Sequence, residues 1–184
     1  DRGWATVRAA AIACLLGVFS WPGLSLRGSA ALFARARAAG VATMLDTGWD
    51  PCGWQPETLA ALRELLGQTT IFMPNQDEAA AITGRPEPEE AARALAGLGP
   101  ELVVVKMGGQ GSIAFCAGRI LRQPALPVDV VDCVGAGDVF NAGFLRARLR
   151  GETLEECLRF GAATAAVYIS RGRDRFPSAG EVKA

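Results

Sequence analysis

The stretch Asp132-Cys133-Val134-Gly135-Ala136-Gly137-Asp138 lies between an apolar run at residues 128–131, predicted to be a strand, and a helix predicted over residues 136–149. Its small residues let the backbone approach another backbone or a phosphate closely. The free N–H groups and the dipole at the start of the helix favour an anion there. An aspartate at this place can accept a proton from a hydroxyl while the anion site holds the phosphoryl group being transferred. Taken alone, G-x-G-D is also explained by a glycine-rich turn in which Asp138 merely begins a helix.

Strand and helix signals alternate on both sides of this stretch from residue 29 onward. Besides the run at residues 128–131, strands are predicted over residues 41–45, 70–73 and 102–107, followed by a hairpin over residues 112–115 and 120–123. Helices are predicted over residues 29–39, 56–67, 75–83, 89–96, 136–149 and 153–169. This alternation indicates an α/β fold of three layers, α/β/α, with a mostly parallel central sheet.

Composition excludes several classes of chemistry. The chain has no histidine, which rules out Ser-His-Asp catalysis and histidine-ligated metal sites. Its 19 basic and 19 acidic residues balance, so it has no electrostatic signature of nucleic-acid or membrane binding. The five cysteines are scattered and indicate a reducing, cytoplasmic compartment. The apolar run at residues 9–19 favours a buried strand or a mis-assigned start over a signal peptide.

Residues 132–145 resemble the C-terminal signature of the PfkB carbohydrate kinases, a ribokinase-like family in which it usually reads D-T-x-G-A-G-D. Cys133 stands where the family most often has Thr. The resemblance continues through Phe140, Ala142, Gly143 and Phe144. It implies that Asp138 is the catalytic base. It also implies an anion hole made by the backbone amides of Gly135, Ala136, Gly137 and Asp138.

A second motif, Asn75-Gln76-Asp77-Glu78, follows a predicted strand. A capping box explains it, with Asn75 as the N-cap and Glu78 three residues further on. The family has an N-x-x-E motif in the same order. That resemblance implies that Glu78 helps to hold the hydration shell of Mg²⁺ and that Asn75 lies near the ATP phosphates. Both interpretations can hold, because a cap would fix the carboxylate that metal binding needs.

A third motif joins a buried strand to a glycine-rich turn and reads Val103-Val104-Val105-Lys106-Met107-Gly108-Gly109-Gln110-Gly111. Ligands of such sheets bind beyond the carboxyl ends of the strands. The motif resembles the family's T-x-G-x-x-G strand end, which borders the nucleotide. It therefore implies ATP contacts for Lys106, Gly108 and Gly111. A surface lysine beside a hairpin turn is the alternative.

Three weaker resemblances concern the rest of the site. Residues 160–163 and 170–172 resemble the family's late helix and adenine-side loop, which implies that Ala162 and Gly172 leave room for a purine. The carbonyl groups of residues 170–172, with Asp132, are implied as a site for a monovalent cation such as K⁺. A helix packed through alanines is the alternative. Only Asp46 matches the family's D-x-N-x-R motif, and a turn aspartate explains it equally.

The resemblance covers about residues 32–177, and the early strands, lid and Gly-Gly motif of the family do not occur before residue 29. We therefore expect residues 1–28 to be unlike the family or to reflect a mis-assigned start. Residues 29–184 are expected to be the ATP-binding and catalytic portion of a kinase domain that lacks its N-terminal strands and lid. The predicted function is phosphorylation of a sugar or sugar acid with ATP and Mg²⁺. No nucleic-acid or membrane partner is expected. Whether the whole kinase is a homodimer is left open. A nucleoside kinase and a non-catalytic remnant are the alternatives.

Overall fold

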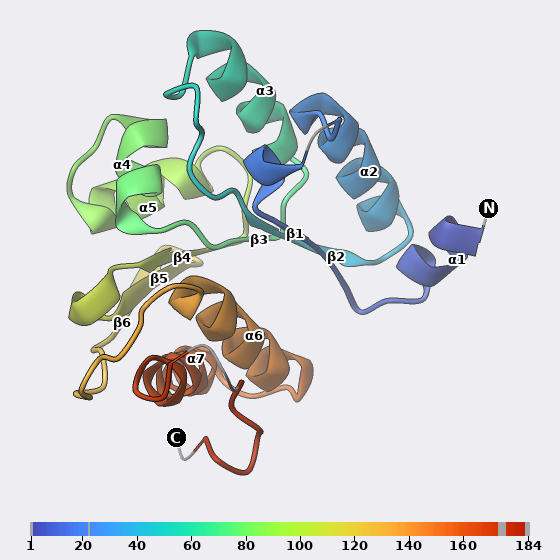
Figure 1. Ribbon diagram of the computed structural model, residues 1–184. Coiled ribbons are helices and arrows are strands. Elements are labelled where there is room, and N and C mark those ends of the chain that lie inside the picture. Colours follow the sequence, from blue (N-terminus) through green and yellow to red (C-terminus); the bar gives the residue numbers. More distant parts are fainter. Residues whose placement is uncertain (1, 22, 173–175, 183–184) are drawn as a thin grey trace. The chain divides into compact units, whose positions relative to one another are not determined.

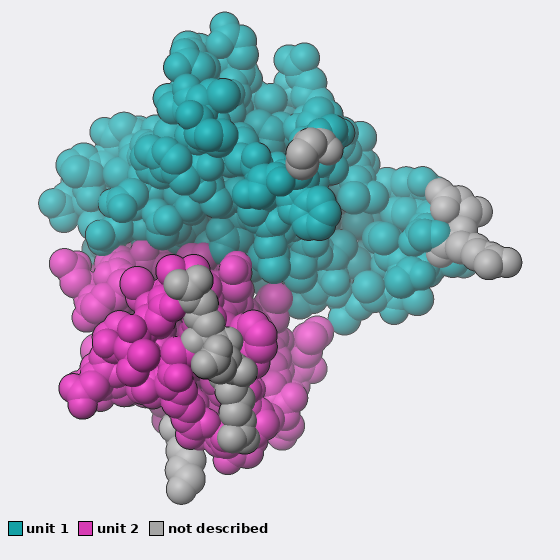
Figure 2. All heavy atoms as spheres, in the orientation of Figure 1, with its two compact units in different colours: residues 1–105, 115–120 teal, residues 106–114, 121–184 magenta. Residues whose placement is uncertain are grey.

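The computed structural model describes residues 2–21, 23–172 and 176–182 (Figure 1). The chain forms two compact units, which are coloured separately in Figure 2. The first comprises Asp1–Val105 and Phe115–Ile120, and the second comprises Lys106–Ala114 and Leu121–Ala184.

The described residues form one six-stranded sheet in which the strands follow one another in chain order. The strands are β1 (Ile12–Leu16), β2 (Ala42–Asp46), β3 (Ile71–Phe72), β4 (Leu102–Lys106), β5 (Ser112–Cys116) and β6 (Arg119–Gln123). Strands β1 to β4 pair in parallel. Only Ala117 and Gly118 separate β5 from β6, and their positive φ angles of 48° and 79° match the two-residue turn of an antiparallel hairpin. The predicted hairpin is thus confirmed, and the sheet is mixed.

Seven α-helices occur within the described residues: α1 (Arg2–Arg8), α2 (Leu26–Ala38), α3 (Pro56–Leu66), α4 (Gln76–Thr83), α5 (Pro88–Ala96), α6 (Ala136–Leu149) and α7 (Leu154–Ile169). Short 3₁₀ turns, Val18–Ser20 and Gly108–Gln110, follow β1 and β4. The two ends of α3 follow from the sequence, since Pro56 fits the first helical turn and Gly67 is the C-cap residue. The predicted helices are therefore formed, with shifts of a few residues at their ends.

The first unit contains helices α2 to α5, which Figure 1 shows on one side of strands β1 to β4. Parallel strands need apolar cover, and the side chains of Met44, Leu45 and Phe72 are fully buried. Phe33 of α2 and Leu62 of α3 are also fully buried. This core fixes the strands, and hence the loops that follow their carboxyl ends.

The second unit contains α6 and α7, which are joined by a short loop and pack closely against each other. Glycine makes this approach possible, because a Cβ atom on Gly143 would collide with Thr164. A Cβ atom on Gly161 would lie only 3.1 Å from Phe140. The two helices therefore form a tightly packed pair that carries the G-A-G-D stretch at the start of α6.

Two local predictions were wrong. Residues 128–131 form no strand; Val130 and Val131 are 60% and 68% exposed, and the N–H of Val131 donates to Ile169 O of α7 rather than to a neighbouring strand. Ser29 does not cap α2, since Ser25 accepts a hydrogen bond from Gly28 N and Ser29 lies buried inside the helix. Apolar character alone cannot supply a pairing partner for a strand, and both serines have the same capping chemistry.

Candidate active site

The N-cap residue at the start of α6 provides no side chain that caps the helix. This residue, Gly135, has φ 85° and ψ 0°. The first N–H groups of any α-helix have no acceptor within the helix, and the helix dipole is positive at this end. Ala136 N donates to Cys133 O at 3.1 Å, which closes the turn before the helix. Gly135 leaves the first turn without a side-chain cap, while the Ala136 amide is engaged with Cys133; the anion hole expected over Gly135 to Asp138 stays a prediction.

Lys106 lies against this helix start. It is the last residue of β4, and a Cβ atom built on Gly137 would lie 3.4 Å from its Nζ atom. The ammonium group therefore stands beside the first turn of α6, where Asp138 is exposed. The third sequence motif and the G-A-G-D stretch meet within the second unit. A lysine ammonium, a helix N-terminus and an exposed carboxylate are the groups that phosphoryl transfer requires of a protein.

Tyr168 of α7 supports the same loop, a role that no sequence motif indicates. Its hydroxyl group donates a hydrogen bond of 3.1 Å to Val134 O, and a Cβ atom on Gly135 would lie 3.1 Å from that hydroxyl. The side chain is buried, and its ring stacks on Phe176 at 5.6 Å. Tyr168 is the chain's one tyrosine and lies in an alanine-rich helix, but a tyrosine in an apolar helix usually signals core packing.

Asp132 shapes the turn before Gly135. Its Oδ1 atom accepts a hydrogen bond of 2.9 Å from Val134 N, while its own N–H donates to Ile169 O at 3.3 Å. An aspartate that bonds to the backbone two residues on is a common turn device. This local role does not conflict with the predicted cation site, which stays a prediction.

The other residues of the second unit that were predicted to contact the nucleotide differ from one another in how closely they are packed. Gly111 has φ 94° and packs against the backbone of residues 123–125, where a Cβ atom would collide. Gly108 has φ 55°, and no heavy atom lies within 4 Å of a Cβ atom built there. Gly172 lies next to Val131, and Ala162 is buried within α7. Close backbone packing thus explains Gly111, while Gly108 borders open space.

Asn75 and Glu78 form the capping box that begins α4 in the first unit. Asn75 Oδ1 accepts from Glu78 N at 2.8 Å, and Glu78 Oε2 accepts from Asn75 N at 3.0 Å. A third hydrogen bond of 2.8 Å joins Asn75 Nδ2 to Glu78 Oε1. Glu78 is 3% exposed. The capping interpretation is therefore confirmed, and the carboxylate is held in one position.

The loop after β2 is organised by a residue other than the one the sequence pointed to. Asp46 is buried and its Oδ1 accepts a long hydrogen bond of 3.4 Å from Gly48 N. Asp50, also buried, accepts from Cys52 N at 2.9 Å and from Trp54 N at 2.8 Å. These bonds identify Asp50 as the structural centre of the loop.

A sequence model described as pfkB family carbohydrate kinase matches residues 2–179. The chain belongs to this family. The match includes residues 2–28, in which the sequence offers no family motif. Membership accords with the α/β architecture, which solved ribokinase-family structures share.

Individual relatives of this pfkB-family chain act on different acceptors. The chain is 40% identical to a cytidine kinase from Thermococcus kodakarensis over 116 residues, which cover 61% of the chain and 41% of that protein. It is 29% identical to a 5-dehydro-2-deoxygluconokinase from Shouchella clausii, with 100% of the chain and 58% of that protein covered. The structure of Arabidopsis thaliana ribokinase complexed with ribose and ATP superposes with a TM-score of 0.78 at 32% identity, covering 92% of the chain and 53% of that protein.

The chain thus spans about half the length of the proteins that it resembles. Among the helices of the described residues, none is both long and apolar enough to cross a membrane.

Proposed function

We propose that the protein transfers a phosphoryl group from ATP to a hydroxyl group of a sugar or sugar acid. The observation that carries this proposal is the position of Lys106 Nζ beside Gly137, at the uncapped start of α6 and next to Asp138. A fixed cation and free N–H groups stabilise the charge of a phosphoryl group in transfer, and a neighbouring carboxylate can take the proton of the acceptor.

In this mechanism Asp138 is the general base. It occupies the first turn of α6 and is exposed, so an acceptor hydroxyl can approach it. The amides of Gly135, Ala136, Gly137 and Asp138 form the anion hole. Positive φ at Gly135 sets the direction in which these N–H groups point, and Tyr168 holds the preceding carbonyl group.

ATP would be held on the same side of the second unit. Lys106 is suited to the phosphates because its ammonium group is a compact point charge. Gly108 leaves space beside it, and we assign Gly111, Ala162 and Gly172 to the border of the nucleotide from their motif positions. Asn75 is assigned to the phosphates on the same ground.

Mg²⁺, when bound with ATP, neutralises negative charge on the phosphates. We assign Glu78 to its hydration shell, because Asn75 holds this carboxylate in one position through three hydrogen bonds. Magnesium commonly keeps several waters and needs one or two protein carboxylates. Asp132 and the carbonyl groups of residues 170–172 are the proposed site of a monovalent cation such as K⁺.

The relatives support two acceptor classes. Ribokinase and 5-dehydro-2-deoxygluconokinase point to a sugar or sugar acid. The identity of 40% to a cytidine kinase favours a nucleoside as the second candidate. The scattered free cysteines support a reducing, cytoplasmic location. A homodimeric parent stays a prediction.

Direct nucleotide binding followed by an acceptor panel tests the proposal. Titration calorimetry with an ATP analogue and Mg²⁺ should show saturable binding to the purified chain. The full-length protein, incubated with ATP and with hexoses, pentoses, sugar acids or nucleosides in turn, should phosphorylate one of the first three classes. Turnover on nucleosides alone would establish the second candidate. Nucleotide binding without turnover on any acceptor would favour a non-catalytic remnant, and absence of nucleotide binding would contradict the proposed site.

A further inference from the structure

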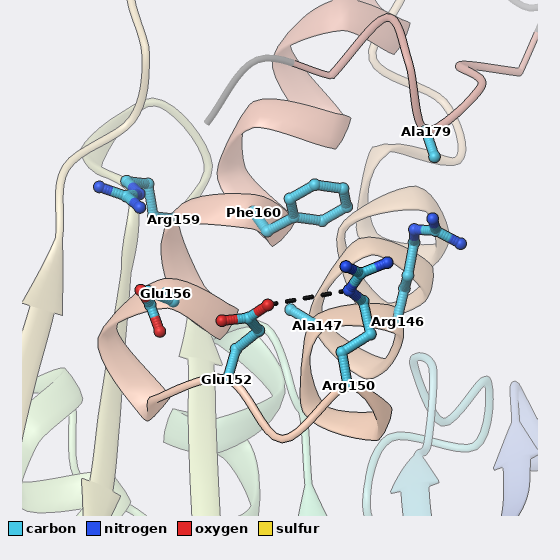
Figure 3. A pocket seen from close by; sticks show the side chains of 8 residues that line it. All are labelled: Arg146, Ala147, Arg150, Glu152, Glu156, Arg159, Phe160 and Ala179. Atoms are coloured by element: carbon cyan, nitrogen blue, oxygen red, sulfur yellow. Dashed lines mark ion pairs between the residues drawn. The ribbon is translucent and has the colours of Figure 1, made fainter.

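A second candidate site lies at the far end of α6 from Gly135. A cavity of about 320 Å³ opens in the second unit beside the end of α6 and the first turns of α7 (Figure 3). It is lined by Arg146, Ala147, Arg150, Glu152, Glu156, Arg159, Phe160 and Ala179. Arg146 is two helical turns beyond Asp138, which is about 12 Å along the helix axis. The cavity is therefore distinct from the proposed catalytic site.

Two arginines concentrate positive charge on one wall. Arg146 and Arg150 are four residues apart on α6, and Figure 3 shows their side chains next to each other. Like charges at this spacing on a helix repel each other. Arg150 forms an ion pair with Glu152, in which its Nε atom is 3.7 Å from Glu152 Oε1. Arg146 forms no ion pair with any residue that the structure describes. An anion between the two guanidinium groups would relieve their repulsion.

The two carboxylates of the cavity are already engaged. Glu152 pairs with Arg150. Glu156 caps α7: its Oε2 atom accepts from Thr153 N and from Thr153 Oγ1, each at 2.9 Å. These hydrogen bonds, first that from the backbone and then that from the hydroxyl group, lower the pKa of Glu156. Glu156 therefore keeps its negative charge, but neither carboxylate forms an ion pair with Arg146.

The rest of the lining consists of Arg159 and three apolar residues, Ala147, Phe160 and Ala179. In Figure 3 the ring of Phe160 extends towards Arg146 and Arg150, while Arg159 points away from them. Ala147 and Ala179 complete this part of the wall. A cavity of this size is at the lower end of the range for small-molecule sites, which usually combine apolar walls with a few placed polar groups.

We propose that this cavity binds a small organic phosphate monoester, with the phosphate between Arg146 and Arg150 and the organic part against Phe160. Planar guanidinium groups bind the oxygens of phosphates and carboxylates through paired hydrogen bonds, which favours a ligand with such an anionic group over an uncharged one. The alternative is that the arginines in the last turns of α6 only stabilise the helix through their interaction with its dipole. That alternative predicts no ligand.

Calorimetric titration distinguishes a phosphate-ester site from a purely structural role of the arginines. The protein, with its nucleotide site filled by an ATP analogue and Mg²⁺, is titrated with inorganic phosphate, glucose 6-phosphate and glucose. We expect saturable binding of glucose 6-phosphate, weaker binding of phosphate and none of glucose. Arg146→Ala should raise the Kd for glucose 6-phosphate at least about tenfold, the effect of losing a charged hydrogen-bond partner. Arg146→Lys, which keeps the charge without the planar fork, should cause a smaller rise.

Arg148→Ala is the matched control, because Arg148 is exposed on the same helix but does not line the cavity. It should leave the Kd unchanged. Phe160→Leu should weaken glucose 6-phosphate binding and leave phosphate binding unchanged. The proposal would be overturned by absence of phosphate-ester binding, by equal effects of Arg146→Ala and Arg148→Ala, or by binding that disappears when the nucleotide site is filled. These measurements involve no turnover, so they stand or fall separately from the proposed kinase activity.

Discussion

The helices α4 and α6 begin in opposite ways. At α4, the side chains of Asn75 and Glu78 bond to each other's backbone and close the helix start. At α6, the N-cap residue Gly135 has no side chain that could cap the helix. It has a positive φ and makes no side-chain hydrogen bond to the first N–H groups of the helix. Both motifs resemble functional elements of the same family. Their comparison shows that side chains cap the start of α4, whereas no side chain of the N-cap residue caps the start of α6, where we propose that a ligand binds.

The surroundings of the two starts extend this contrast. Lys106 brings a positive charge to the first turn of α6, beside Gly137. At α4 the acidic Asp77 and Glu78 occupy the first turn, where they already complement the positive end of the helix dipole. An anionic ligand is therefore favoured at α6 and disfavoured at α4. The following changes test this difference, from the largest expected effect to the smallest.

Asp138→Asn should have the largest effect. If Asp138 is the general base as proposed, this change should lower the kcat of the full-length protein by about 10²- to 10⁴-fold, while nucleotide binding persists. Steady-state kinetics with the best acceptor and titration with an ATP analogue measure the two properties. Asp129→Asn removes an exposed aspartate of the preceding loop and should leave both unchanged. Near-normal turnover of Asp138→Asn would remove the assignment.

Lys106→Met should weaken nucleotide binding because the phosphates lose a charged partner. A hydrogen bond to a charged group contributes about 1.5–3 kcal/mol, so the Kd for an ATP analogue should rise about 10- to 100-fold. Arg119→Met, at the exposed turn of the β5–β6 hairpin, is the control for the loss of one positive charge. If both variants bind the nucleotide equally well, Lys106 is a surface lysine and the open helix start lacks its cation.

Tyr168→Phe should loosen the turn that leads into α6. Loss of the hydroxyl bond to Val134 O should lower the free energy of unfolding by about 0.5–1.5 kcal/mol. It should also lower kcat more than it raises the KM for the acceptor, since the anion hole becomes less well positioned. Ser170→Ala removes the hydroxyl bond of the C-cap residue of α7 to Val167 O and keeps the backbone carbonyl of residue 170 that is proposed for the cation site. Equal kinetic effects in the two variants would show that Tyr168 contributes only packing.

Glu78→Gln tests whether the closed start of α4 has a second role. Glutamine can still cap the helix but has no charge, so we expect a higher Mg²⁺ requirement with little loss of thermal stability. Glu156→Gln makes the same change in the capping box of α7 and should leave the Mg²⁺ requirement unaltered. Titration of activity with Mg²⁺ and thermal melting measure both effects. A fall in stability with unchanged Mg²⁺ dependence would leave Glu78 as a capping residue alone.

Much of the fold and part of the site could be predicted from the sequence. The α/β architecture, the hairpin turn at Ala117 and Gly118, and the capping box of Asn75 and Glu78 were predicted, and each is confirmed. The strand predicted over residues 128–131 was wrong because apolar character supplies no pairing strand, and here it does not lead to burial either, since Val130 and Val131 are exposed. The cap of α2 was misplaced because Ser25 and Ser29 are chemically equal candidates one helical turn apart.

What the sequence by itself determined is local. A cap, a glycine with positive φ or a two-residue turn acts within one helical turn or one hairpin, so the residues concerned are neighbours in the chain. The tertiary structure decided which distant residues meet. It places Lys106 beside Gly137 and the hydroxyl of Tyr168 on the carbonyl of Val134, 34 residues away. Such contacts depend on how residues of the second unit that are far apart in the chain pack against one another, which no short stretch of the sequence specifies.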